Sequence, residues 1–334
     1  MRLGLIAVSS KTGLGYQTRD YYRHLNPLKT MVVDISAING KTQNPHWYPN
    51  GIFINGFPRE REIELFLNDL DVVLTAETPY NFELFSIAKR RGVKTVCVEN
   101  PEFYDYFKYP HLPMPDLIIL PSNWMEAEIR AHAEPLGTQV VQLHHPVDRG
   151  VFKFNLRKSK KFVHVAGNPA VNDRNGTFDA LAACPQLIVV TQKEHLAKMI
   201  RARYSGSRVF DNLEDNLELY NLGDILVFPR RYGGNCLPLN EALSCGMPVI
   251  MPNISPNNNL LPGEWLVPAY ENGYFEPRGR VNLYSVDVQK LMEKIDWFIN
   301  CDIEKESEKA NQIAESISWK ELGPKWMQTL ESLL

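Results

Sequence analysis

A glycine-rich stretch in the second half of the chain has the residue types of an anion-binding loop. It follows the apolar segment 225–228 and precedes a helical pattern that opens near Pro238. Glycines let backbone N–H groups approach a phosphate, and a helix N-terminus carries partial positive charge. We therefore predict contacts with a diphosphate or a sugar hydroxyl. The predicted contact residues are Gly233, Gly234, Asn235, Cys236 and Leu237.

Glu241 is expected about one turn into the same helix, where it is the next candidate for ligand binding. Its two carboxylate oxygens suit the paired hydroxyls of a ribose, because both oxygens accept hydrogen bonds. The alternative is a glutamate that only compensates the helix dipole.

A second glycine pattern lies near the N-terminus, directly after the apolar run Leu3–Val8. Gly13 and Gly15 with Thr18 give the spacing G-x-G-x-x-T, which lacks the third glycine of a dinucleotide fingerprint. Asp34 lies where a dehydrogenase would carry its ribose-binding acid. The pattern predicts a second phosphate-facing turn at Gly13 and Gly15, and a tight turn without ligand is the alternative.

These loops require a particular set of elements to position them. Short apolar, β-branched runs alternate with helical patterns from residue 3 to 143, and the alternation restarts at Phe162 after a break at 144–161. Such alternation predicts two doubly wound parallel sheets of the Rossmann-like α/β class. We expect an N-terminal domain over residues 1–147, a C-terminal domain over 148–317, and a final helix over 318–334 that packs back on the first domain.

Composition narrows the class of protein. The chain has 334 residues, 44% hydrophobic, 22% charged and with a net charge of −3, which is typical of a globular protein without a global nucleic-acid or membrane signal. The five cysteines are scattered without a C-x-x-C pair, and this favours a reducing, cytoplasmic location. No run approaches about 18 apolar residues, so no membrane span is predicted. The string Asp69-Leu70-Asp71 falls at a helix-to-strand junction, and we predict no metal site.

The stretch 219–250 resembles the donor-binding signature of the retaining GT-B glycosyltransferase family 4 (group 1), which includes sucrose, trehalose and mannosyl transferases. The signature is Glu-Gly-Phe-Gly-Leu-Pro, a second Glu eight residues after the first, and then Ala-x-x-x-Gly-x-Pro-Val. The residues in register with it are Gly234, Leu237, Pro238, Glu241, Ala242, Gly246, Pro248 and Val249. The resemblance implies two facing Rossmann-like domains, with a nucleotide sugar, UDP-linked in many members, on the second and an acceptor on the first.

Three positions depart from the family pattern. Gly233 stands where the family's first glutamate contacts hydroxyls of the transferred hexose, so we expect an empty space of several heavy atoms there. Either the donor sugar lacks or masks these hydroxyls, or Asn235 reaches them, and we favour Asn235. The family's cationic pair falls on Asn168 and Arg174, and only Arg174 keeps the charge. The resemblance therefore implies that Arg174 stabilises the leaving diphosphate. Arg230 and Arg231 are the next candidates for this role, and the alternative is that they belong to a solvated loop. The first-domain histidine of the family falls near Glu99.

The acceptor side is expected in the first domain. Glu77 and Glu99 follow apolar runs, and each is predicted either to orient a substrate or to be a structural carboxylate. The loop 102–116 is rich in aromatics, with Tyr104 and Tyr106 expected to line the acceptor side; packing of the loop is the open alternative.

The sequence therefore predicts a retaining, metal-independent glycosyltransferase without a bound cofactor. The acceptor stays open between three classes: a modified DNA base, which compact phage enzymes of this kind use, a glycan, and a small molecule. The basic run 157–161 would suit DNA or a solvated linker. The rival predictions are a GT-B sugar-nucleotide epimerase or phosphorylase, an NAD-dependent oxidoreductase, and a sugar-nucleotide-binding protein with a degenerate site.

Overall fold

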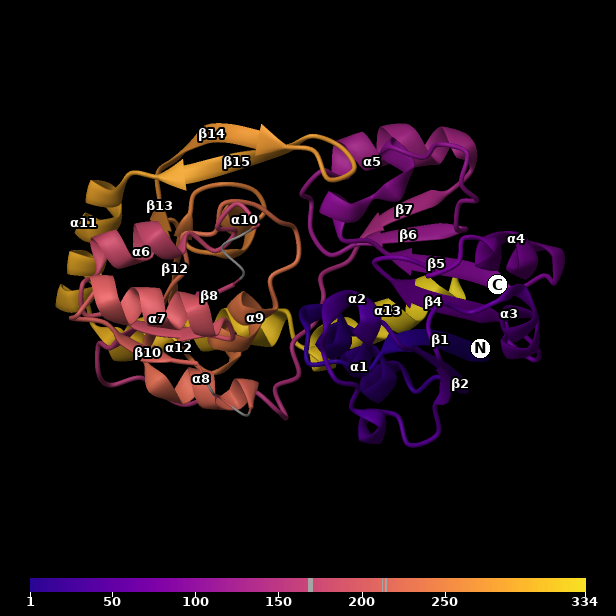
Figure 1. The fold of residues 1–334 in the computed structure, drawn as a ribbon, viewed down its shortest axis with the longest axis horizontal. Coiled ribbons are helices and arrows are strands. Elements are labelled where there is room, and N and C mark those ends of the chain that lie inside the picture. Colours follow the sequence, from indigo (N-terminus) through magenta and orange to yellow (C-terminus); the bar gives the residue numbers. More distant parts are fainter. Residues whose placement is uncertain (168–170, 212, 214) are drawn as a thin grey trace. The chain divides into compact units, whose positions relative to one another are not determined.

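The chain divides into two compact units in the computed structural model, which describes residues 1–167, 171–211, 213 and 215–334 (Figure 1). The first unit comprises Met1–Pro146, Pro277–Gly279 and Trp319–Leu334, and the second comprises Val147–Glu276 and Arg280–Ser318. Each unit is built on its own parallel sheet.

The first unit contains a seven-stranded sheet in the order β3-β2-β1-β4-β5-β6-β7. Its strands are β1 (Leu3–Val8), β2 (Lys29–Val33), β3 (Ile52–Ile54), β4 (Val72–Ala76), β5 (Lys94–Val98), β6 (Leu117–Leu120) and β7 (Gln139–Gln142). Its helices are α1 (Gly13–Leu25), α2 (Ser36–Asn39), α3 (Glu60–Phe66), α4 (Glu83–Arg90), α5 (Glu126–Ala133) and α13 (Trp319–Glu331), with 3-10 turns at Pro45–Trp47, Pro101–Phe103, Asp105–Phe107 and Glu134–Leu136. The strand order reverses between β1 and β4, so the loops after these two strands flank a switch point, where ligands of open α/β sheets bind.

The second unit contains a six-stranded sheet in the order β10-β9-β8-β11-β12-β13 and a separate antiparallel hairpin, β14-β15. The strands are β8 (Phe162–Ala166), β9 (Ile188–Thr191), β10 (Arg208–Phe210), β11 (Ile225–Val227), β12 (Val249–Pro252), β13 (Leu266–Val267), β14 (Ala269–Phe275) and β15 (Val281–Val286). The helices are α6 (Thr177–Ala183), α7 (Glu194–Arg203), α8 (Asn216–Leu222), α9 (Leu237–Ser244), α10 (Asn257–Leu260), α11 (Val288–Asn300) and α12 (Ile303–Ser316), with a 3-10 turn at Gly263–Trp265. Here the order reverses between β8 and β11.

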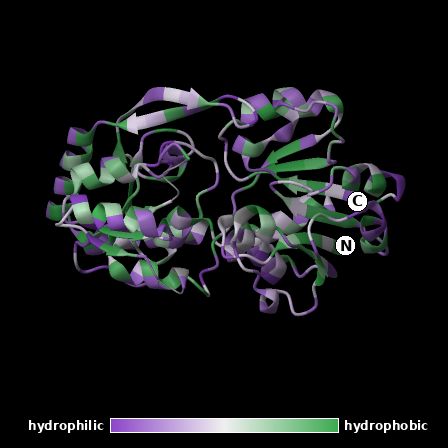
Figure 2. Cartoon of the chain, viewed as in Figure 1, coloured by the Kyte–Doolittle hydropathy of each residue, from purple (hydrophilic) through white to green (hydrophobic). Residues whose placement is uncertain are grey.

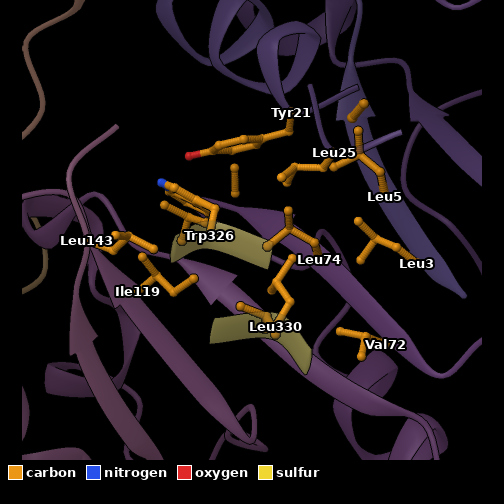
Figure 3. Close-up of a cluster of buried hydrophobic side chains, with 14 of the residues drawn as sticks. Leu3, Leu5, Tyr21, Leu25, Val72, Leu74, Ile119, Leu143, Trp326 and Leu330 are labelled. Atoms are coloured by element: carbon orange, nitrogen blue, oxygen red, sulfur yellow. The ribbon is translucent and has the colours of Figure 1, made fainter. Parts of the chain in front are cut away.

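The last helix belongs to the first unit. Trp326 and Leu330 of α13 are fully buried against Tyr21 of α1 and Leu74 of β4 (Figure 3). The indole Nε1 of Trp326 donates to the backbone oxygen of His144 at 3.1 Å. Each side chain buried to this degree contributes about 1.5–3 kcal/mol. The helix is therefore an integral part of the first unit's core.

Hydropathy follows the layers. Strands β1, β4, β11 and β12 consist of buried residues and are largely hydrophobic, whereas hydrophilic residues are common on the outer helices (Figure 2). Strands covered on both faces show continuous apolar runs, which is why the sequence predicted them. The hairpin is different, because most of β14 is exposed.

Candidate functional site

Two loops flank the switch point of the second sheet. One follows β8 and leads to α6 through Arg174, and the other follows β11 and leads to α9 through Gly233. The loops are in close contact: a Cβ atom at Gly176 would lie 2.2 Å from the backbone oxygen of Pro229, and the amide of Arg231 donates to the backbone oxygen of Arg174 at 2.8 Å. The sheet topology therefore brings residues 57 positions apart (174 and 231) into one group.

The N-terminus of α9 faces the end of the glycine loop without a side-chain cap. Cys236 is the N-cap residue and makes no capping hydrogen bond with its side chain, while Pro238 occupies the first turn. The backbone oxygen of Cys236 accepts from Leu239 at 3.1 Å and from Asn240 at 3.3 Å, so the helix is regular from its start. First-turn amides of an uncapped helix suit an anionic ligand.

Two guanidinium groups converge beside Gly233. A Cβ atom added at Gly233 would lie 2.3 Å from Nη2 of Arg230 and 2.5 Å from Nη2 of Arg174. Gly233 also has φ +117°, a backbone region that favours glycine. The expectation of an empty space at this position is therefore wrong, because the arginines fill it.

The two arginines are held by their surroundings in different ways. The Arg230 side chain is buried, and its Nε donates to the backbone oxygen of Tyr232 at 2.9 Å. The Arg174 guanidinium lies over the ring of Tyr232, 5.0 Å from its centroid. Such a cation–π contact stabilises the charged group and fixes its plane. Tyr232 thus organises both cations.

Arg231 has a structural role instead of the reserve role considered from the sequence. Its Nε donates to the backbone oxygen of Tyr284 at 3.0 Å and its Nη2 to Ser285 Oγ at 3.3 Å, both in β15. Its Nη1 donates to the backbone oxygen of Asn172 at 3.1 Å. Arg231 therefore ties the two loops to the hairpin, and it is not a solvated loop residue.

Glu241 lies in the second turn of α9, and its carboxylate meets a residue that the sequence did not single out. The hydroxyl of Tyr220, in α8, donates to Glu241 Oε2 in a short hydrogen bond, and both side chains are buried. Burial raises the pKa of Tyr220 well above its usual range, and the Glu241 carboxylate adds to the effect. Tyr220 therefore stays protonated and orients Glu241. Nothing in the spacing of 220 and 241 signals this pair.

The first unit has its own glycine turn at the switch point. Gly15 is required there by packing, because a Cβ atom would lie 1.9 Å from the backbone oxygen of Ser10, whereas one at Gly13 would meet nothing within 4 Å. Thr12 Oγ1 accepts from the Gly15 amide at 3.2 Å, so this helix N-terminus already carries a side-chain cap. Asp34 accepts from the Ser36 amide at 2.8 Å, which gives that acid a local structural role.

Glu77 and Glu99 follow the adjacent strands β4 and β5. Asn100 Nδ2 donates to Glu77 Oε2 at 2.7 Å. The Glu99 carboxyl is buried, and its Oε2 has no hydrogen-bond partner among the described residues. Burial raises the pKa of Glu99 to about 8, and the charges of Asp105 and Glu77 add to this, although a hydrogen bond with Cys97 opposes it. At neutral pH the group is therefore mostly a neutral carboxylic acid.

Comparison with solved structures identifies the fold. A glycosyltransferase from Rickettsia africae matches over 99% of this chain and 97% of its own, with a TM-score of 0.71 and 13% identity. HepE from Anabaena, solved in complex with UDP, matches with a TM-score of 0.71 and 13% identity over 99% and 100% of the two chains. Sucrose-phosphate synthase from Thermosynechococcus elongatus matches with a TM-score of 0.68 and 14% identity, over 99% of this chain and 98% of its own. The chain has the GT-B fold. No protein-family model matches the sequence, and no curated protein does so either.

These matches confirm the GT-B fold that the sequence predicted. Seven of the predicted site residues lie on the loops and helix at the second unit's switch point: Arg174, Gly233, Gly234, Asn235, Cys236, Leu237 and Glu241. In the first unit, Gly13 and Gly15 lie in the first turn of α1, and Glu77 and Glu99 follow β4 and β5. Asn168 lies outside the described residues. The roles of these residues stay predictions.

Two tyrosines of the aromatic loop 102–116 are buried in this GT-B chain, whereas the sequence suggested that they line the acceptor side. Tyr104 and Tyr106 are fully buried in a cluster with Ile118 and Leu120 of β6. The Tyr104 hydroxyl is 3.0 Å from Nδ1 of His132, and the Tyr106 hydroxyl donates to the backbone oxygen of Pro113 at 3.1 Å. The packing alternative therefore describes these two side chains, and an acceptor-facing role for them does not fit their burial.

Two cations of the basic run 157–161 donate to backbone oxygens of the second unit. The Arg157 side chain is buried and donates to backbone oxygens of Tyr220, Gly223 and Cys245. Lys160 Nζ donates to the backbone oxygens of Ile299 and of Cys301, the latter at 2.7 Å. These cations satisfy carbonyl groups at helix ends. A DNA-binding interpretation of the run is therefore not retained.

In the part of the chain that the structure describes, no cluster of three or more His, Cys, Asp or Glu side chains is arranged to hold a metal ion. Asp71, from the D-x-D string, instead pairs with Arg2 at 2.6 Å. Nor does any described helix have the length and apolar character needed to cross a membrane.

Proposed function

We propose that this chain is a glycosyltransferase that transfers a sugar from a nucleotide-diphosphate donor to an acceptor hydroxyl. The observation that carries the proposal is the second unit's switch point. There an uncapped helix N-terminus, two guanidinium groups and the Glu241 carboxylate are supplied by two adjoining loops and one helix. A nucleotide sugar has the complementary groups, namely a diphosphate and a ribose diol.

The proposed donor site divides the nucleotide between these groups. The α9 amides and Arg174 would bind the diphosphate, since charge-assisted hydrogen bonds to phosphate are the stronger ones. Glu241 would accept hydrogen bonds from the ribose hydroxyls, with its carboxylate oriented by the Tyr220 hydroxyl that donates to Oε2. Gly233, Gly234, Asn235, Cys236 and Leu237 would line the path between diphosphate and sugar.

The proposed chemistry needs stabilisation of the leaving group. The bond from the anomeric carbon to the diphosphate oxygen breaks with its electron pair on phosphate, and a bond to the acceptor oxygen forms. On the retaining mechanism that the family resemblance implies, the leaving phosphate takes the acceptor proton, so no dedicated base is required. Arg174 would stabilise the developing charge, which is typically the largest single catalytic contribution.

The first unit is proposed to present the acceptor. Glu99 would act as a neutral carboxylic acid that donates a hydrogen bond to a sugar or acceptor oxygen, with Glu77 as its neighbour. A neutral acid in a dry site provides a donor without a buried charge. Gly13 and Gly15 would give the substrate close access to the backbone after β1.

Calorimetric titration with UDP, GDP, ADP and NADH tests the donor assignment. We expect one nucleoside diphosphate to bind with a 1:1 stoichiometry and NADH not to bind. Binding of NADH alone would support the oxidoreductase instead. Diphosphate binding without turnover, across a broad panel of sugar donors and acceptors, would indicate a binding protein.

A further inference from the structure

A buried histidine contacts the ends of both loops that form the candidate site in the second unit. His164 belongs to β8, and its side chain is fully buried. Its Nδ1 lies 2.7 Å from the backbone oxygen of Val227, the last residue of β11, where one loop begins. Its Nε2 lies 3.0 Å from Oγ1 of Thr177, the first residue of α6, where the other loop ends. One imidazole ring therefore joins the two loops at their bases.

The two contacts fix the protonation state of the ring. A backbone oxygen can only accept a hydrogen bond, so Nδ1 carries the proton and donates to Val227. Nε2 of the neutral ring then accepts from the Thr177 hydroxyl. Burial lowers the pKa of His164 to about 4, although the hydrogen bond to Val227 and the charge of Asp173 act in the opposite direction. The ring is therefore neutral at physiological pH, as these two hydrogen bonds require.

The ring lies where the two central strands of this sheet stop pairing. The register of β8 and β11 ends with Val163 opposite Leu226. One residue further along each strand, the backbone oxygen of Val227 accepts from the His164 side chain. Because an imidazole ring is rigid, it sets the separation of the two strand ends. The switch point of the sheet lies between these same strands, and the loops of the candidate site leave from it.

Thr177 also anchors the turn that carries Arg174. Its amide donates to Oδ1 of Asp173 at 3.0 Å, and Asn175 Nδ2 donates to the backbone oxygen of Val165 at 2.9 Å. Asp173 has φ +44°, an unfavourable left-handed conformation that persists only where the surroundings hold it. A shift of Thr177 is therefore transmitted to the backbone of Arg174, three residues before it.

We propose that His164 is a positioning residue of the donor site, whose hydrogen bonds to Thr177 and Val227 hold the turn of Arg174 in place relative to the β11 loop. The inference rests on the proposed function and deepens it, because His164 acts on the leaving diphosphate through Arg174 and not by touching it. A misplacement of about 1 Å can cost on the order of 10²-fold in rate. Loss of one of these hydrogen bonds should therefore affect turnover more than stability.

Two substitutions remove the same hydrogen bond from opposite ends. Thr177→Val keeps the shape of the side chain and removes the hydroxyl. His164→Asn can place an amide nitrogen at the position of Nδ1, so it keeps a donor for Val227 and loses Nε2. Thr177→Ser, which retains the hydroxyl, is the matched control. Ile200→Ala, on the buried face of α7, controls for a loss of stability alone.

Nitrogen-15 NMR of histidine-labelled protein tests the hydrogen bonds independently of any activity. The resonances that are missing from the His164→Asn spectrum should show a protonated Nδ1 and an unprotonated Nε2 in the native chain at neutral pH. A protonated Nε2 would remove the acceptor for the Thr177 hydroxyl and overturn the proposal.

The effect of each variant on turnover should depend on Arg174. In a transfer assay with UDP-, GDP- and ADP-sugars and mixed acceptors, Thr177→Val and His164→Asn should each lower kcat by about tenfold or more. In the Arg174→Ala background the same substitutions should lower kcat by less than about twofold, because the group that they position is gone. Thr177→Ser should retain most of the native kcat. Ile200→Ala should lower the melting temperature and leave kcat unchanged.

The outcomes separate this inference from the proposed function. If the native chain transfers sugar, and both variants keep the native kcat or lower it by the same factor with and without Arg174, the positioning role is wrong and the function stands. If the native chain transfers no sugar but binds UDP, GDP or ADP in calorimetry, the function is contradicted. The positioning role then requires Thr177→Val to weaken that binding by about tenfold, with no further loss in the Arg174→Ala background. If the native chain neither transfers sugar nor binds a nucleoside diphosphate, both fail.

Discussion

Replacing Glu99 by glutamine should stabilise the protein at neutral pH, and the gain should vanish in acid. Burial raises the pKa of this carboxyl from 4.5 to about 8. A raised pKa means that the folded chain binds more protons than the unfolded chain between these two values. The stability that protonated Glu99 contributes is therefore fully present below pH 4.5 and is lost as the pH rises towards 8.

The size of the effect follows from the gap between pH and the unfolded pKa. At pH 7, which is 2.5 above the ordinary pKa of 4.5, keeping Glu99 protonated costs the native chain about 3 kcal/mol of folding free energy. At pH 5 the same cost is about 1 kcal/mol. Glutamine has nearly the same shape and does not ionise. The difference in free energy of unfolding between Glu99→Gln and the native chain should therefore favour the variant by about 3 kcal/mol more at pH 7 than at pH 4.

Urea unfolding of the native chain and Glu99→Gln at pH 4, 5 and 7 checks this, with Glu128→Gln as the control because Glu128 is exposed on α5. The control should show no pH-dependent difference from the native chain. A stability difference for Glu99→Gln that stays constant across the three pH values would refute the neutral carboxyl, and with it the hydrogen-bond donor role proposed for Glu99.

Four other variants probe the remaining parts of the account. Arg174→Ala should lower kcat by about 10²–10³-fold in a steady-state assay, as removal of one leaving-group contact does, and an intact kcat would exclude that role. Glu241→Gln should weaken donor binding in calorimetry by about 1.5–3 kcal/mol, and Tyr220→Phe by about 0.5–1.5 kcal/mol; unchanged binding in both would make the pair purely structural. Tyr104→Ala should cost about 3–5 kcal/mol in urea unfolding because it opens a cavity in the core, whereas a stable variant with a raised acceptor KM would restore the acceptor-side role.

The sequence predicted the elements that are buried on both faces. The apolar run Leu3–Val8 coincides with β1, because a continuous buried run has few alternative structures. The hairpin β14-β15 and strand β3 were not predicted, because their exposed residues lack such a run. Helix α12 was not predicted either, although Asp302 caps its first turn.

Residue spacing predicted the part of the site that is local in the chain, and only the family resemblance added Arg174. The glycine loop and the start of α9 follow one another in the sequence, so their spacing indicated an anion-binding turn. The contacts of Glu241 with Tyr220, and of Gly233 with Arg174, join residues brought together by sheet topology. The loss of a glutamate at 233 therefore suggested a vacancy, whereas the space is filled by arginines from the folded loops.

Sugar transfer itself is the most direct test of the central claim. The native chain and Arg174→Ala would be incubated with a panel of UDP-, GDP- and ADP-sugars and mixed glycan and small-molecule acceptors. Released nucleoside diphosphate and the mass gain of the acceptor would both be measured by mass spectrometry. We expect one donor to give diphosphate release that depends on an acceptor, equals the sugar gained, and is at least 100-fold slower in Arg174→Ala. Acceptor modification without release of a nucleoside diphosphate, or release that Arg174→Ala leaves unchanged, would contradict the account.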